Sequence, residues 1–164
     1  GMMGHGIAYV SALSGMNVVM TDADQEAAEA GKERIAAIMA KRVKRGRMDQ
    51  KKMDGVLANI TATDDYGLLD GCDLIIEAVF ENRELKASVT KMAEAALDES
   101  GVFASNTSTL PISGLANASI RPEKFIGLHF FSPVDRMQLV EIIMGEKTDD
   151  ETLAKAFDLS LIHI

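Results

Sequence analysis

The chain has 164 residues, of which 47% are hydrophobic, and a formal net charge of −8. This length corresponds to about one domain that can bury a sizeable core. The acidic balance argues against a nucleic-acid partner, so any phosphate ligand must be held locally. No apolar run approaches the ~20 residues that span a bilayer, and we expect no membrane span. A single cysteine, Cys72, excludes an internal disulfide and fits a reducing compartment.

Strand and helix patterns alternate along the chain. The first third predicts a helix over 4–14, a strand from Asn17, a helix over 24–44 and a helix at about 50–57. A short strand around Ile60, a strand DLIIEAVF from Asp73, a helix over 85–97, a strand from Val102 and a helical turn near 112–116 follow. After two further apolar runs, a helix begins in DDETLAKAFD at 149–158. Strands separated by helices predict an α/β fold with a doubly wound, mostly parallel sheet.

The two apolar runs near the C-terminus are FIGLHFF from Phe125 and QLVEII from Gln138. Each predicts a short strand, and the turn-like SPVDR between them contains Pro133. A hairpin would place His129 and Glu141 face to face. A neighbouring carboxylate fixes the tautomer of an imidazole and stabilises its charged form, which suits a proton-transfer pair. The alternative is a buried histidine that is satisfied by structural hydrogen bonds.

The N-terminal glycine cluster, GMMGHG, predicts a dinucleotide site. Gly1 and Gly4 supply the last two glycines of G-x-G-x-x-G, where the backbone approaches a pyrophosphate. The first glycine and its strand would precede residue 1, so we expect a truncated chain; a glycine-rich helix start is the alternative. Asp22 ends the second strand about 20 residues on, where a carboxylate accepts ribose hydroxyls. No arginine follows it to bind a 2′-phosphate, which favours NAD over NADP, and Asp24 is expected to cap the next helix.

Five segments together resemble the L-3-hydroxyacyl-CoA dehydrogenase family: GMMGHG, VVMTDAD, IIEAVFENRELK, FASNTSTLPIS and GLHFFSPVDRMQLVEII. The resemblance extends to about Phe157, and it is most similar to the α-subunits of multifunctional fatty-acid oxidation complexes. It implies a Rossmann-like NAD-binding domain over 1–158 that lacks its first strand and the family's C-terminal helical domain. Residues 159–164, LSLIHI, match a translated sequencing adapter, and we expect them to be non-native; an ordinary apolar strand is the alternative.

The resemblance also implies roles for individual residues. His129 would be the catalytic base, Glu141 its orienting carboxylate, and Ser108 a contact to both substrate and nicotinamide. Ser132 replaces the asparagine of single-function members, and its shorter reach leaves a nicotinamide contact open. The other cofactor-binding positions implied are Gly1, Met3, Gly4, Asp22, Val79, Glu81 and Lys86.

Each of two basic residues has two possible roles. Lys86 belongs with Glu81 to the ENxxxK stretch that contacts NAD in the family, but it also fits a solvated helix lysine. Arg42 lies in the basic run 41–47, which would bind the phosphates of coenzyme A or form a solvated helix end whose cations complement the macrodipole.

The activity implied is NAD-dependent oxidation of an L-3-hydroxyacyl-CoA thioester to a 3-ketoacyl-CoA in fatty-acid β-oxidation, without a metal. His129 would remove the proton of the 3-hydroxyl while hydride passes to the nicotinamide. The resemblance implies an oligomeric parent, with a thiolase subunit as a candidate partner, in the bacterial cytoplasm or else the mitochondrial matrix. The alternatives are an NAD dehydrogenase of another hydroxy acid and a non-catalytic dinucleotide-binding relative. We expect the 164 residues alone to be inactive.

Overall fold

The computed structural model describes residues 1–163. The chain divides into two compact units, Gly1–Asp65 with Ser132–Arg136, and Tyr66–Phe131 with Met137–Ile164. Ile164 lies outside the described residues. Each unit contains its own set of paired strands.

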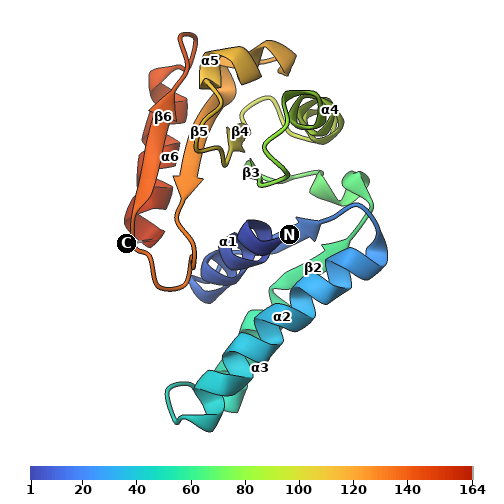
Figure 1. The fold of residues 1–164 in the computed structure, drawn as a ribbon, viewed down its shortest axis with the longest axis vertical. Coiled ribbons are helices and arrows are strands. Elements are labelled where there is room, and N and C mark those ends of the chain that lie inside the picture. Colours follow the sequence, from blue (N-terminus) through green and yellow to red (C-terminus); the bar gives the residue numbers. More distant parts are fainter. Residues whose placement is uncertain (164) are drawn as a thin grey trace. The chain divides into compact units, whose positions relative to one another are not determined.

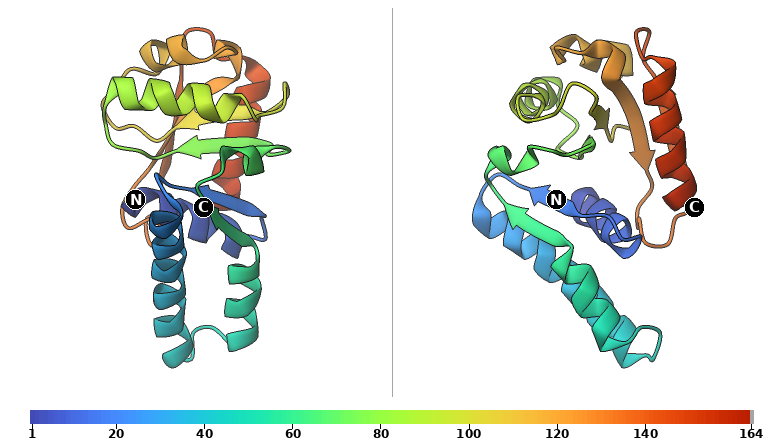
Figure 2. Two further views of the ribbon diagram at one scale, coloured as in Figure 1. Left: turned by 90° about the vertical axis from the view of Figure 1, so that its right-hand side faces the viewer. Right: turned by 180° about the vertical axis from the view of Figure 1, so that it is seen from behind.

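The first unit holds three helices and a parallel pair of strands (Figure 1). Helix α1 (Met2–Leu13) leads to β1 (Val18–Thr21), and α2 (Gln25–Lys44) and α3 (Gln50–Ala58) return the chain to β2 (Ile60–Thr63). Along the parallel ladder, each residue of β1 faces one of β2, from Val18 opposite Ile60 to Thr21 opposite Thr63. Helices α2 and α3 lie side by side in all views (Figures 1 and 2).

Aspartate side chains fix the starts of α2 and α3. Asp24 accepts a hydrogen bond from the Ala27 amide at 2.8 Å, and Asp49 accepts one from the Lys52 amide at 2.6 Å. These bonds satisfy backbone donors that have no partner inside a helix. The prediction that Asp24 caps α2 is confirmed.

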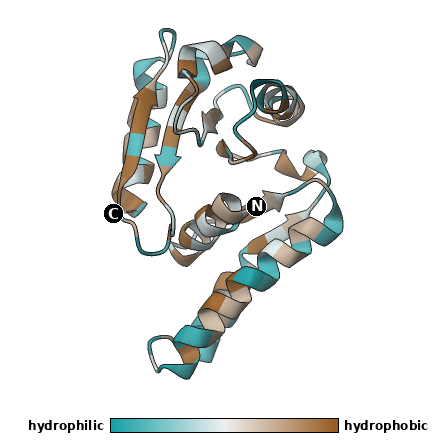
Figure 3. Cartoon of the chain, in the orientation of Figure 1, coloured by the Kyte–Doolittle hydropathy of each residue, from teal (hydrophilic) through white to brown (hydrophobic). Residues whose placement is uncertain are grey.

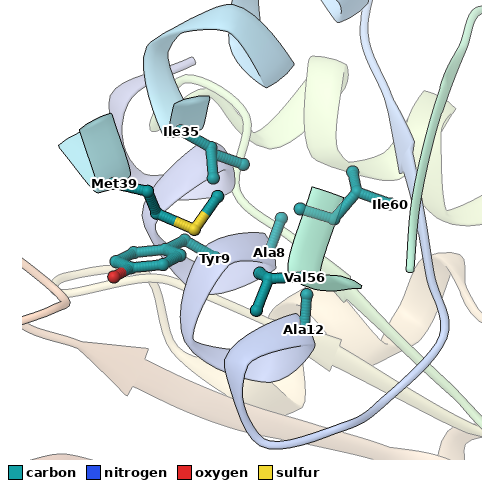
Figure 4. Packing of buried hydrophobic residues seen from close by; sticks show 7 residues of the cluster. All are labelled: Ala8, Tyr9, Ala12, Ile35, Met39, Val56 and Ile60. Atoms are coloured by element: carbon teal, nitrogen blue, oxygen red, sulfur yellow. The ribbon is translucent and has the colours of Figure 1, made fainter. Parts of the chain in front are cut away.

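Helices α1, α2 and α3 bury a common apolar cluster with β2 (Figure 4). Tyr9 and Met39 lie next to each other in it, and the Tyr9 hydroxyl points away from the other cluster residues. That hydroxyl accepts a hydrogen bond from Arg42 Nη1 at 2.7 Å, so a buried phenol is satisfied by a cation on α2. The cluster consists of Ala8, Tyr9, Ala12, Ile35, Met39, Val56 and Ile60.

The second unit is built on a four-stranded sheet in the order β3-β4-β5-β6. The strands β3 (Leu74–Glu77), β4 (Val102–Ser105) and β5 (Phe125–Phe130) are parallel, and β6 (Val140–Met144) is antiparallel to β5. Helix α4 (Arg83–Glu94) follows β3, the short α5 (Ile112–Leu115) precedes β5, and α6 (Asp150–His163) packs against β5 and β6 (Figure 2). Short 3₁₀ turns lie at Tyr66–Leu69, Ala116–Ala118 and Pro122–Lys124. The predicted α/β class with mostly parallel strand pairing is therefore present.

Element boundaries differ from the predictions mainly around β3 and α4. The strand predicted from Asp73 through the apolar AVF ends at Glu77, whose side chain accepts the Val79 amide at 3.2 Å and thereby takes the backbone out of the ladder. Helix α4 begins at Arg83 because the Asn82 side chain caps it, through the Leu85 amide at 2.9 Å. Residues 159–163, expected as a non-native tail, continue α6 as helix.

Hydropathy follows this architecture. Strands β5 and β6 are mostly apolar and each carries a hydrophilic band, whereas the end of the α2–α3 pair at the α2–α3 turn is hydrophilic (Figure 3). Within residues 1–163, no helix combines the length and apolarity needed to cross a membrane.

Candidate functional site

His129 and Glu141 face each other across the β5–β6 ladder. They are direct partners in the antiparallel register, and His129 Nδ1 lies 2.7 Å from Glu141 Oε2. The His129 side chain is 18% exposed and that of Glu141 52%, so the imidazole is partly sheltered while remaining accessible. Because a carboxylate only accepts, Nδ1 donates its hydrogen, and Nε2 is the basic nitrogen of the neutral ring. The predicted contact is present, with the free nitrogen suited to take a proton.

Asn106, just beyond β4, fixes the backbone next to the imidazole. Its Oδ1 accepts a hydrogen bond from the Phe130 amide at 2.9 Å, and its own amide donates to the Glu77 carbonyl at 2.8 Å. The ring of Phe131 lies 4.4 Å from that of His129, centroid to centroid. Neighbouring strands and an aromatic side chain therefore set where the imidazole stands.

Ser108 lies in a loop that Glu81 holds. The Oε1 atom of Glu81 accepts the amides of Ser108 and Thr109 at 3.2 Å each, the Thr109 hydroxyl at 3.1 Å, and the Thr107 hydroxyl. Burial raises the pKa of Glu81, but the hydrogen bonds from Thr107 and Thr109 and the charge of Lys86 outweigh it and hold the pKa at about 2. A carboxylate that is ionised at neutral pH thus fixes the backbone that carries the exposed Ser108 side chain.

Lys86 is buried, and the alternative that it is a solvated helix lysine is wrong. Its side chain is 1% exposed, and its Nζ lies 2.9 and 3.1 Å from the two carboxylate oxygens of Glu77. The same Nζ lies 3.5 Å from Glu81 Oε2, so the two residues expected in the cofactor site are neighbours. Glu77 was missed by the sequence reasoning; the signal that was available is a carboxylate at the end of an otherwise apolar strand.

The first unit holds the glycines and Asp22. Gly1 is the N-cap of α1, and a methyl group added at Gly4 would meet no atom within 4 Å, so the first turn that includes Met3 is open to a ligand. Asp22, directly after β1, accepts the Gly1 ammonium at 2.9 Å and the Ala23 amide at 2.9 Å. Burial raises the pKa of Asp22, whereas the Ala23 amide and the charge of Arg34 lower it. An anionic acceptor after β1 and an unobstructed helix start fit the ribose and pyrophosphate of a dinucleotide.

A basic pocket of about 520 Å³ lies in the first unit, at the C-terminal end of α2. Four members of the predicted basic run line it, whereas Lys44 does not, and Arg136 from the loop after β5 adds a further cation. The helix-end interpretation also holds, since Lys41, Arg42 and Lys44 fall in the last turn of α2. The lining residues are Ile38, Lys41, Arg42, Arg45, Arg47, Pro133, Asp135 and Arg136.

The remaining predicted positions lie in connecting segments. Val79 follows β3 and donates its amide to Glu77, while Ser132 belongs to the loop segment that forms part of the first unit. The same segment brings Val134 onto α1, where a methyl group added at Gly6 would lie 2.9 Å from Val134 Cγ2. The sequence reasoning gave Gly6 no role, although it is the third glycine of GMMGHG.

Comparison with known proteins assigns the chain to a family. Residues 1–161 match the family model described as the NAD-binding domain of 3-hydroxyacyl-CoA dehydrogenase. The chain belongs to the 3-hydroxyacyl-CoA dehydrogenase family. It is accordingly an NAD-binding domain, and the open first turn of α1 and the carboxylate of Asp22 fit that cofactor.

Solved structures of the family are similar over nearly the whole chain. The chain is 37% identical to (S)-3-hydroxybutyryl-CoA dehydrogenase PaaH1 from Ralstonia eutropha, with a TM-score of 0.96, covering 99% of this chain and 58% of that one. It is 34% identical to FadB2 from M. tuberculosis, with a TM-score of 0.93 and coverage of 98% and 56%. It is 32% identical to 3-hydroxybutyryl-CoA dehydrogenase from Escherichia coli, with a TM-score of 0.95 and coverage of 99% and 34%. The chain thus spans between 34% and 58% of the length of these relatives.

Proposed function

We propose that this chain is the cofactor- and base-bearing domain of an L-3-hydroxyacyl-CoA dehydrogenase that works in fatty-acid β-oxidation. The observation that carries the proposal is the hydrogen bond between His129 Nδ1 and Glu141 Oε2 at 2.7 Å. NAD binding alone needs no proton acceptor, so an oriented imidazole in an NAD-binding domain supports catalysis over a purely binding or sensing role. The names of the relatives, which include two 3-hydroxybutyryl-CoA dehydrogenases, support the substrate class.

The residues divide the chemistry between them. His129 Nε2 takes the proton of the substrate's 3-hydroxyl, and Glu141 stabilises the imidazolium that forms. Bound NAD supplies the hydride acceptor. Ser108, in the loop that Glu81 fixes, offers a hydroxyl that donates to the substrate oxygen. General base catalysis of this kind contributes about 10²–10⁴-fold.

Coenzyme A is the part of the substrate that the basic pocket fits. Its phosphates need local cations because the chain as a whole carries a charge of −8. Arg42, Arg45 and Arg136 supply guanidinium groups in one pocket, and guanidinium groups pair with phosphate oxygens through two parallel hydrogen bonds. We therefore propose Arg42 as a substrate-binding residue, together with its neighbours in the pocket.

We extend the proposal to the parent protein. The family resemblance implies a second, helical domain, and this chain spans 58% or less of the relatives described above. The parent would then be longer, with a multifunctional α-subunit as one form, since the chain is also 28% identical to the dehydrogenase part of multifunctional enzyme 1 from C. elegans. Residues 1–158 alone would bind NAD without turning over acyl-CoA.

The test measures NADH formation from 3-hydroxybutyryl-CoA and NAD by the full-length protein that carries this chain. We expect His129→Gln to lose at least about 10²-fold in kcat with NAD affinity unchanged. Glu141→Gln keeps the shape but removes the charge, and it should lower kcat strongly as well. Lys155→Gln, on the exposed face of α6, is the matched control and should keep wild-type turnover.

Two results would contradict the proposal. Bound NAD without turnover in the wild type on acyl-CoA thioesters of any chain length would favour the non-catalytic alternative. Turnover of a free hydroxy acid, with none of the thioester, would assign the fold to a different NAD dehydrogenase.

A further inference from the structure

A buried ion pair lies at the end of β3 and has no direct part in the chemistry proposed above. Glu77 and Lys86 form it, and their side chains are 2% and 1% exposed. Removing two charges from water costs free energy, and well-packed apolar residues in place of such a pair are often neutral or stabilising. Stability of the fold therefore does not by itself account for this pair.

The pair presents a cation to two other groups. Lys86 Nζ lies 3.5 Å from Glu81 Oε2 and 3.4 Å from the Asn106 carbonyl oxygen, in addition to its contacts with Glu77. An ammonium has three hydrogens, and oxygens of the protein surround this one. Lys86 Nζ is therefore directed toward oxygens of its own chain, and the NAD contact that the family resemblance implies stays a prediction.

Each of the two groups leads to a residue of the proposed chemistry. Glu81 accepts the amides of Ser108 and Thr109, which sets the course of the loop that carries Ser108. Asn106 accepts the Phe130 amide at 2.9 Å, one residue after His129. One buried ammonium thus contacts both Glu81, which holds the Ser108 loop, and Asn106, which holds the Phe130 amide.

We infer that Glu77 and Lys86 are a positioning pair, which holds Glu81 on the Ser108 loop and the end of β4 beside His129. The inference rests on the proposed function for its catalytic consequence, but the positioning itself is a structural statement that has its own readout. Neither residue touches the reacting atoms. Their effect reaches the substrate through Ser108 and His129.

The decisive variant is the double substitution Glu77→Gln and Lys86→Met. Either substitution alone leaves one buried charge without its partner, which costs about 3–5 kcal/mol and risks misfolding. The double variant is neutral and close in volume. In the variant, the glutamine oxygen can still accept the hydrogen bond from the Val79 amide. In the wild type the Ser105 hydroxyl donates to Glu77; in the variant it can rotate and accept a hydrogen bond from the glutamine NH₂.

The matched control is Glu151→Gln with Lys155→Met. This pair also has an N···O distance of 2.9 Å and lies in the same unit, but it is exposed on α6 at 58% and 43%. The control removes one negative and one positive charge, as the double variant does. The control should leave kcat and the amide proton chemical shift of Thr109 unchanged.

Two measurements on the full-length protein test the inference. The first is the amide proton shift of Thr109 at pH 7, with Glu81→Gln as the reference for a lost carboxylate bond. We expect the shift in the double variant to move most of the way toward the reference. The second is steady-state kinetics, in which we expect kcat to fall tenfold or more while the KM for NAD changes less than twofold.

The outcomes separate this inference from the proposed function. A Thr109 amide at its wild-type position in the folded double variant would overturn the positioning role, whatever the activity. Wild-type kcat in the double variant of an active enzyme would overturn the catalytic consequence. If the wild-type enzyme does not turn over acyl-CoA, the proposed function fails, and the Thr109 shift still decides whether the pair positions Glu81.

Discussion

Glu81 is a residue whose charge state is set by the loop it holds. Four hydrogen bonds from Thr107, Ser108 and Thr109 reach one of its oxygens, and its pKa is lowered from 4.5 to about 2. A lowered pKa in the folded state stabilises the fold above the unfolded pKa, and this contribution is lost as the pH falls through the folded pKa. The window of loss is therefore about pH 4.5 to 2.

We predict that Glu81→Gln flattens the acid limb of stability in this window. The free energy of unfolding of the wild type should exceed that of the variant at pH 6, and the two should converge toward pH 2. Urea unfolding at intervals between these pH values checks it. A difference that stays constant with pH would show that the glutamine disturbs packing and that the charge of Glu81 is not involved.

The sequence predicted some site residues better than others, for a physical reason. His129 and Glu141 lie in adjacent apolar strands joined by a short turn, so local patterns were enough to bring them together. The pairing of Glu77 with Lys86 depends on how α4 packs on the end of β3, and a lysine in a helix is solvated in most proteins. Burial of such a residue follows from tertiary packing, which periodicity does not report.

At the level of elements, α1 has two glycines with opposite surroundings. A methyl group at Gly4 meets open space, whereas one at Gly6 would lie 2.9 and 3.0 Å from two atoms of Val134. Helix-interior glycine is unfavourable by about 1 kcal/mol relative to alanine, so the absence of a side chain at Gly6 is explained by the contact with Val134. The close approach seats the loop 132–136 on the helix.

We predict that Gly6→Ala and Gly4→Ala separate packing from cofactor binding. Gly6→Ala should lower the free energy of unfolding by about 1–3 kcal/mol through overpacking. Gly4→Ala should keep or raise stability but weaken NAD binding, because its methyl group would project into the open space where we expect the pyrophosphate to lie. Gly55→Ala, in α3 with no atom within 4 Å, is the control and should gain about 0.5–1 kcal/mol. Urea unfolding and NAD titration measure both effects, and equal loss of NAD affinity at all three sites would contradict the assignment.

Element order and type were largely predictable, and element ends were less so. The alternation of β-rich and Ala/Glu/Lys-rich segments predicted the parallel pairs and the final hairpin, as found. The end of β3 was placed too late because the apolar AVF continues its pattern beyond Glu77. There a side-chain hydrogen bond to the backbone competes with the ladder, and composition does not reveal such a bond.

At the scale of the whole molecule, positive charge is concentrated in one pocket although the net charge is negative. The chain carries −8 overall, yet one pocket gathers Lys41, Arg42, Arg45, Arg47 and Arg136 around the single acid Asp135. Exposed charges act over a Debye length of about 10 Å at 0.1 M salt. The cations of the pocket therefore attract an anionic ligand only at short range, while the acidic residues elsewhere oppose its approach.

We predict that Arg45→Gln raises the KM for acyl-CoA about tenfold and leaves the KM for NAD unchanged. Added salt should weaken acyl-CoA binding in the wild type more than in the variant, since fewer charges remain to be screened. Lys51→Gln, exposed on α3 and not among the residues that line the pocket, is the matched control. An unchanged KM for acyl-CoA in Arg45→Gln would leave the cations of this helix end as solvated charges that complement the macrodipole.

The register of β5 and β6 has a consequence for how this protein can change over generations. His129 and Glu141 are opposite each other because Leu128 faces Ile142 and Phe130 faces Val140. Insertions or deletions confined to the loop between the strands, and outside its segment 132–136 that packs on α1, leave that alignment intact. A single residue gained or lost inside either strand turns one of the two side chains to the opposite face of the sheet. Lineages of this family should therefore tolerate length variation in the loop outside 132–136 and reject it inside β5 or β6, so that the pair is inherited as one aligned ladder.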